Sequence, residues 1–474
     1  MFERPPYLKI AITALALGCS LVSARTFTDA SGRTMEAEIV EYTGGDKVTI
    51  LRDDGKQFTI PLNRLSDADQ EFVRNWTPPA PKEVDADEIK QMNELLGVEL
   101  FTDGNLWDDN AAEVAKRLDW PQESKTQSQS SFRKYNGEDD RILSARPHSS
   151  ALYGQDGKVD MISIVFANKG DSAGNAFAMS KKQIKEAVKT AVEADGKTLE
   201  QKLATLGPAE QQTTAAGRSM KERLQRWDWN GHAILLAVQD EEYVALRIMP
   251  TKLADNRGRP ERVATSELKS AAKANVEERG NGDVIIRNIP MVNQGPKGYC
   301  VPATLERTLR YMGIRADMYL LAMAGETAIG GGTYASDLVE GTERYVKSAG
   351  RKLEDVNVRL KASAIAKYID QGQPVMWGMY STTEYNALVN AFTSSRKQFA
   401  TAKEWKDELK DKLKDVDDLE ADREMGHMCL IVGYNEETDE IAVTDSWGPE
   451  FEERWIPAQQ ASKVSQGSFW VVDF

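Results

Sequence analysis

Cysteine and histidine are scarce in this chain, which has three of each among 474 residues. The close paired spacing of structural zinc motifs is absent. Beyond the N-terminus no run of about 20 apolar residues occurs, so we expect no transmembrane segment in the mature chain. Basic residues are outnumbered, and the formal charge of −14 argues against nucleic acid and anionic membranes as partners. The composition is typical of a globular protein of two to four domains.

The first 24 residues differ from the rest. Two basic residues precede an apolar run at 10–17, and small residues follow at 22–24. This layout is typical of a secretory signal peptide that is cleaved after Ala24. A lipoprotein signal with lipid attachment at Cys19 is the minor alternative, and a buried N-terminal helix is a third. The sequence therefore predicts an exported protein, located in the periplasm, on the cell surface or in the medium.

Residues 25–76 form the first predicted unit. Apolar and polar residues alternate with period two between glycine-containing turns at 43–46 and 53–56, which indicates a small antiparallel β-module. A short helix is expected after Ser66 as N-cap. The stretch beginning RTFTDASGRTMEAEIVEYTGGDKVTIL resembles SLA1 homology domain 1, whose members are small SH3-like β-barrels. This resemblance implies binding of a protein partner, or a spacing role. The Pro-rich residues 77–84 then form a linker.

Residues 85–280 are predicted to form an α+β domain of unknown role. A long helix is expected around residues 180–207, closed by Gly-Pro, and residues 224–250 are expected to form a hairpin of two strands around Asp240-Glu241. The domain is a candidate propeptide, inhibitor or targeting domain. No processing site is evident between 270 and 290, which favours an accessory domain.

Two of the three histidines, His148 and His232, lie in this middle region. Trp227 and Trp229 precede His232 in an apolar strand, which favours a packed strand residue over a catalyst. The third histidine, His427, is the only one in the C-terminal third, at the start of the apolar strand GHMCLIVGYN.

The stretch NQGPKGYC ends at Cys300, directly before a segment with helical periodicity. A cysteine at a helix N-terminus is stabilised as thiolate by unpaired N–H groups and the macrodipole. Asp445 ends the strand after that of His427, so its carboxylate can hold one ring nitrogen while the other takes a proton from sulfur. Gln294 can donate a side-chain N–H to an oxyanion on an acyl substrate.

Gln294, Cys300, His427 and Asp445, in this order, resemble the papain-like cysteine peptidases, and the short C39-like form is most similar. The resemblance covers about 286–474. It rests on the six-residue step from glutamine to cysteine, the helix start CVPATLERTLRYMG, the histidine strand, and DSWG, which is similar to the papain NSWG. It implies that Cys300 is the nucleophile and His427 the general base and acid. It also implies that Asp445 is the orienting carboxylate and Gln294 the oxyanion donor. A protein or peptide substrate and no cofactor are expected.

Two departures from the family pattern stand out. Val301 follows the cysteine where glycine is usual, which narrows the approach to the thiolate or slows turnover. An inserted segment at about 381–425 contains Trp405 on an apolar helical stripe, and a surface helix packed on the domain is favoured over a lid. The glycines at 330–332 are expected to border the substrate cleft or to form a simple loop.

The sequence leaves other readings open. Cys300 and Cys429 in an oxidising compartment could pair as a structural disulfide. A zinc site from these cysteines with His427 and Asp445 has acceptable ligand types. A peptidoglycan amidase and a transglutaminase-like acyl transferase use the same chemistry. A catalytically inactive scaffold or binding protein of the cell envelope is the alternative of another class. The favoured architecture is α+β multidomain, with an SH3-like barrel, a middle domain and a papain-like peptidase fold.

Overall fold

The computed structural model describes residues 25–42, 44–52, 57–77, 84–172, 179–214, 220–259, 261–329, 332–414, 416 and 419–474. The predicted signal peptide with Cys19, the turn at 53–56, most of the Pro-rich linker, and Gly330 and Gly331 lie outside the described residues. The chain divides into two compact units, Met1–Glu83 and Val84–Phe474. Within the described ranges, no helix has both the length and the apolar character needed to cross a membrane.

In its described residues, the first unit has a four-stranded antiparallel sheet and the helix α1. Its strands follow in the order β1 (Arg25–Thr28), β2 (Thr34–Glu41), β3 (Lys47–Arg52) and β4 (Gln57–Pro61), and α1 spans Asp67–Arg74. Phe27, Ile50 and Val73 belong to one buried cluster of sheet and helix. Ser66 accepts from the N–H of Asp69, so the predicted N-cap is confirmed. β1 and β4 are the two ends of the order found in the described part, and a closed SH3-like barrel stays a prediction.

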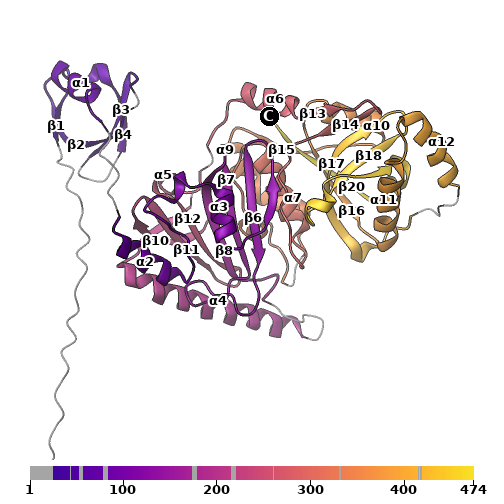
Figure 1. The fold of residues 1–474 in the computed structure, drawn as a ribbon, viewed down its shortest axis with the longest axis horizontal. Helices are drawn as coiled ribbons and strands as arrows, with labels where there is room; N and C mark the ends of the chain where they lie inside the picture. Colours follow the sequence, from indigo (N-terminus) through magenta and orange to yellow (C-terminus); the bar gives the residue numbers. More distant parts are fainter. Residues whose placement is uncertain are drawn as a thin grey trace, which may run out of the picture. The chain divides into compact units, whose positions relative to one another are not determined.

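The second unit contains two antiparallel sheets of eight strands (Figure 1). The first sheet has the order β5-β6-β7-β8-β12-β11-β10-β9. Its strands are β5 (Gln122–Lys125), β6 (Gln129–Tyr135), β7 (Ser149–Gln155), β8 (Lys158–Asn168), β9 (Glu210–Thr213), β10 (Arg223–Trp229), β11 (His232–Gln239) and β12 (Tyr243–Pro250).

The hairpin expected over residues 224–250 is wrong in its number of strands, because β10, β11 and β12 lie there. The additional turn is formed by Asn230 and Gly231, whose φ angles are 41° and 76°. Asn-Gly favours this left-handed conformation, and a two-residue hairpin turn with it matches the twist of the flanking strands. The turn expected at Asp240-Glu241 is present between β11 and β12.

The two faces of the first sheet have different neighbours. Helices α2 (Ala86–Leu96), α3 (Ala111–Arg117) and α4 (Lys181–Leu203) share a buried cluster with alternate residues such as Leu236. The long helix expected in this region is therefore confirmed as α4. On the other face, Leu235 packs in a cluster with Tyr299 and Tyr319, which lie beyond the first sheet in the sequence. The second half of the unit thus covers this face directly.

The second sheet has the order β13-β14-β17-β16-β20-β15, with β18 paired to β17 and β19 paired to β18. Its strands are β13 (Val276–Glu278), β14 (Asp283–Ile286), β15 (Lys352–Asp355), β16 (Val375–Tyr380), β17 (Gly426–Asn435), β18 (Glu440–Thr444), β19 (Arg454–Pro457) and β20 (Ser465–Asp473). The helices of this half are α5 (Thr251–Asp255), α6 (Thr265–Ala274), α7 (Cys300–Tyr311), α8 (Met318–Ala324), α9 (Ala335–Ser348), α10 (Ala362–Ile369), α11 (Thr383–Arg396), α12 (Ala402–Lys412) and α13 (Ala458–Lys463).

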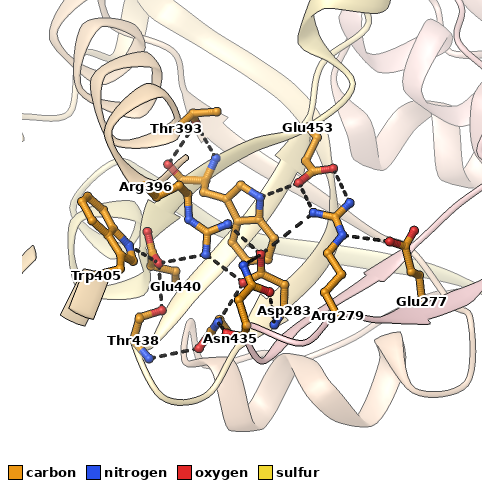
Figure 2. Close-up of polar contacts among 12 residues, drawn as sticks. Glu277, Arg279, Asp283, Thr393, Arg396, Trp405, Asn435, Thr438, Glu440 and Glu453 are labelled. Carbon is orange, nitrogen blue, oxygen red and sulfur yellow. Dashed lines mark hydrogen bonds and ion pairs between the residues drawn. The ribbon is translucent and has the colours of Figure 1, made fainter. Parts of the chain in front are cut away.

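The inserted segment before β17 forms α11 and α12, at the outer side of the second sheet (Figure 1). Trp405 of α12 is buried with Phe392 of α11, so the expected surface helix packed on the domain is confirmed. Figure 2 shows how both helices are tied to the sheet. Arg396 pairs with Asp283 at 2.8 Å and with Glu440 at 3.3 Å, and the indole N–H of Trp405 donates to Glu440 at 2.8 Å.

Candidate active site

Cys300 is the first residue of α7, so the prediction that it begins a helix is confirmed. The residue is 8% exposed, and its thiol lies near the His427 ring, close enough for the ring to shift the pKa of the thiol. Burial raises the pKa of the thiol, but the hydrogen bond and charge of His427 outweigh burial, and the pKa lies below its ordinary value. The helix N-terminus stabilises the same charged form. The local environment therefore favours a thiolate.

His427 is the second residue of β17 and is 8% exposed. Its Nε2 lies 2.8 Å from Asp445 Oδ1, which leaves Nδ1 for the Cys300 sulfur. The Trp447 ring stacks on the imidazole, with centroids 4.7 Å apart. Burial lowers the pKa of His427, but the hydrogen bonds with Asp445 and Cys300 outweigh burial and raise the pKa to about 9. The imidazolium form is thus stabilised between an acidic side chain and a thiolate.

Asp445 directly follows β18 and is 1% exposed. One carboxylate oxygen faces His427, and the other accepts from Arg454 of β19. Arg454 also donates to the side-chain oxygens of Asn386 at 3.0 Å and Asn390 at 3.2 Å, both on α11. Burial raises the pKa of Asp445, but His427 and Arg454 outweigh it and hold the pKa below its usual range. The carboxylate therefore remains ionised between two cations.

Gln294 lies in the loop between β14 and α7. Its backbone N–H donates to the carbonyl oxygen of Ser446 at 2.8 Å. Because Ser446 directly follows Asp445 in the chain, this bond holds the loop beside Asp445. The buried side-chain Oε1 has no hydrogen-bond partner among the described residues. The structure thus brings the loop with Gln294 to the strand end that carries Asp445.

Helix α7 is also bound to the strands that carry the other two residues. Thr304 Oγ1 donates to the carbonyl oxygen of Met428 at 3.1 Å, one residue after His427. The buried Arg307 donates from Nη2 to Thr444 Oγ1 at 2.7 Å, one residue before Asp445. These bonds hold the helix of Cys300 against β17 and β18, because each reaches a residue adjacent to a site residue.

Cys429 and Val301, which stands where the family usually has glycine, lie in the core. Cys300 and Cys429 are both free, and Cys429 is fully buried, as predicted for a small apolar residue. Burial raises the pKa of the Cys429 thiol well above its usual range. Val301 is buried in the same apolar cluster as Cys429. The described residues contain no group of three His, Cys, Asp or Glu side chains that could hold a metal ion.

The two histidines of the middle region lie elsewhere. His232 is fully buried, accepts from the Leu106 N–H at 3.2 Å and lies against Trp107 and Trp229, so the prediction of a packed strand residue is confirmed. His148 lies 3.0 Å from the carboxylate of Asp171.

Two further residues, Trp447 and Arg454, contact the site. Trp447 belongs to the DSWG motif, which does not indicate that its ring stacks on His427. The contact of Arg454 with Asp445 is not evident from the sequence, since arginine at this position has no motif spacing to reveal it. Alternation within the short strand RWIP gives no sign that the arginine points into a buried site.

Comparison with known proteins bears on the C-terminal part. Residues 286–470 match the model of the Peptidase_C39 like family. This match covers the loop of Gln294, α7, the inserted helices, strands β16–β19 and the first part of β20. It supports a cysteine peptidase-like domain in this part of the chain. No curated protein gives a significant match to the sequence.

Proposed function

We propose that residues 286–474 act as a cysteine peptidase on a protein or peptide substrate. The arrangement of Cys300 beside His427, which bonds Asp445, carries this proposal, because it supplies a thiolate, a proton carrier and an orienting carboxylate. The similarity of residues 286–470 to the Peptidase_C39 like family supports the same activity.

In the proposed reaction, the thiolate of Cys300 attacks the carbonyl carbon of the scissile peptide bond. A C–S bond forms while the carbonyl π electrons move to oxygen, and Gln294 and the Cys300 N–H donate to that oxyanion. Imidazolium His427 gives its proton to the amine as the C–N bond breaks. His427 then deprotonates a water molecule, which attacks the thioester and releases the acid and the thiolate.

We propose further that the protein is exported and that its first unit contacts a protein partner. The signal-peptide layout of residues 1–24 supports export. The resemblance of residues 25–76 to SLA1 homology domain 1, together with their compact antiparallel sheet, supports a binding or spacing module. Under this proposal the substrate is extracytoplasmic.

A catalytically inactive scaffold is the second candidate. Two observations favour it, namely the low exposure of Cys300 and the burial of Val301 where the family usually has glycine. A scaffold has no requirement for an activated thiol, so thiol reactivity separates the two candidates.

The deciding experiment is alkylation by iodoacetamide as a function of pH, with the labelled cysteine identified by mass spectrometry. For the peptidase we expect Cys300 to react at neutral pH about 10-fold faster or more than in His427→Ala, because the imidazolium stabilises the thiolate. Buried Cys429 serves as the internal control and should stay unlabelled. An ordinary thiol titration of Cys300 in both proteins would favour the scaffold, and cleavage of denatured casein would exclude it.

A further inference from the structure

The segment between β14 and α7, residues 287–299, is held largely by the first sheet. The N–H of Asn293 donates to Glu123 Oε1 at 2.7 Å, and the Asn293 carbonyl accepts from the Tyr135 hydroxyl at 2.7 Å. The N–H of Met291 donates to Ser124 Oγ at 2.9 Å. Strands β5 and β6 thus fix the backbone immediately before Gln294.

The acceptor for Asn293 is itself held rigidly. Glu123 is buried, pairs with Arg133 at 2.7 Å and accepts from Ser131 at 3.0 Å. A buried carboxylate with this many partners has little freedom to move, since any displacement would leave a charge unpaired.

The Tyr135 ring adds a steric constraint on the residue after Gln294. Gly295 has φ of +72°, and a Cβ at this position would lie 2.9 Å from the Tyr135 ring. The ring therefore packs directly on the Gly295 backbone, which only glycine permits here. Gln294 lies between two residues that Tyr135 contacts.

The other end of the segment is anchored by Tyr299, which directly precedes Cys300. Its hydroxyl donates to Asn168 Oδ1 at 2.7 Å and accepts from the Gly170 N–H at 2.9 Å. Tyr299 is fully buried in the cluster that joins the first sheet to α7 and α8. A Cβ on Gly170 would lie 2.3 Å from the Tyr299 hydroxyl, so the fit leaves no room for a side chain.

We propose that the first sheet positions the oxyanion side of the active site, with Tyr135, Glu123 and Tyr299 as positioning residues. The inference rests on the proposed peptidase function. It assigns residues 84–250 a part in every catalytic cycle, since removal of this region would remove the contacts that hold Asn293 and Tyr299 on either side of Gln294 and leave the bond from the Gln294 N–H to Ser446. A propeptide that is discarded on activation does not fit these contacts.

The test compares Tyr135→Phe with Tyr345→Phe in the full chain. Both substitutions remove a tyrosine hydroxyl that donates to a backbone carbonyl, and the Tyr345 hydroxyl donates to Arg315, away from the loop. Two reagents probe the site. Iodoacetamide reports the thiolate alone. In the reaction with a peptide aldehyde, a C–S bond forms between Cys300 and the carbonyl carbon, and the carbonyl π electrons move to oxygen. His427 protonates this oxygen, which as a hydroxyl still accepts hydrogen bonds from the oxyanion donors.

We expect Tyr135→Phe to weaken aldehyde binding about 10-fold and to leave the alkylation rate unchanged. This effect is smaller than that of removing an oxyanion donor, because the substitution only shifts the donor. Its kcat on casein should fall while KM stays the same, and Tyr345→Phe should match wild type in all assays. Equal behaviour of the two variants would overturn the inference. An equal loss with both reagents would also overturn it, because the substitution would then act on the Cys300–His427 pair. A wild-type protein inert to iodoacetamide would instead refute the proposed function itself.

Discussion

The two eight-stranded sheets of the second unit each bury one histidine at the start of a strand, and the pKa values of the two rings are shifted in opposite directions. His232 begins β11 and His427 is the second residue of β17. Burial lowers the pKa of His232, and the hydrogen bond with the backbone carbonyl of Trp229 offsets this lowering only in part. Burial acts in the same direction on His427, yet its pKa is raised to about 9.

The neighbours explain this difference. Aromatic rings surround His232, and its Nδ1 lies 3.1 Å from the Trp229 carbonyl while Nε2 accepts from a backbone N–H. His427 lies between the Asp445 carboxylate and the Cys300 thiol. Burial alone therefore does not identify a functional histidine; the ionisable groups on its two nitrogens do.

The largest expected effect comes from exchanging each histidine for glutamine. His427→Gln should lower cleavage of casein on the order of 10³-fold, because an amide cannot carry the proton between sulfur, amine and water. His232→Gln keeps groups that can bond the same backbone atoms, so its cleavage rate should stay within about 3-fold of wild type. Comparable losses in both variants would contradict the contrast between the sheets.

A smaller effect is expected from Asp445→Asn, which gives His427 a neutral neighbour. An amide has one acceptor oxygen, whereas Asp445 serves both His427 and Arg454, so one of the two donors would face an NH₂ group. The pKa of His427 should fall from about 9. As the pH rises, the variant should therefore lose the imidazolium, and cleavage with it, at a lower pH than wild type does. Near neutral pH we expect a loss of about 10- to 100-fold.

The control for Asp445→Asn is Asp283→Asn. Asp283 is equally buried and pairs with Arg396 of the inserted segment (Figure 2), so its substitution disturbs a similar ion pair that does not include His427. It should lower the melting temperature without moving the pH profile of cleavage. An unmoved profile in Asp445→Asn as well would show that the carboxylate does not set the proton affinity of His427.

Much of the candidate site was predictable because its residues lie at informative places in the sequence. A cysteine before a helical repeat, a lone histidine at a strand start and an aspartate at the next strand end define positions that secondary structure alone brings together. Arg454 could not be found in this way. Its role depends on β19 pairing with β18 and on asparagines from an inserted helix, which are contacts between segments without a fixed spacing.

The fold was predictable element by element, and less so in its assembly. Capping by Ser66 correctly predicts α1, and the helical periodicity of the apolar residues correctly predicts α4 and the helix of Trp405. The sequence does carry a signal for the Asn230-Gly231 turn, since Asn-Gly is a strong hairpin dipeptide. The packing of Tyr299 into the first sheet had no signal at all, because a single tyrosine before a cysteine does not indicate which distant glycine it will contact.

The smallest effect concerns the stability of the first sheet in acid. The pKa of His232 is lowered in the folded chain, so below its ordinary value near 6.5 the unfolded chain takes up a proton that the folded chain resists. The stability that neutral His232 contributes is present above pH 6.5 and is lost as the pH falls. We expect the contribution of this group to the unfolding free energy to fall between pH 6.5 and 5.5. His232→Gln should remove that part of the slope, as measured by urea unfolding at both pH values. An unchanged slope in this variant would show that His232 titrates alike in both states, and the contrast with His427 would then rest on the second sheet alone.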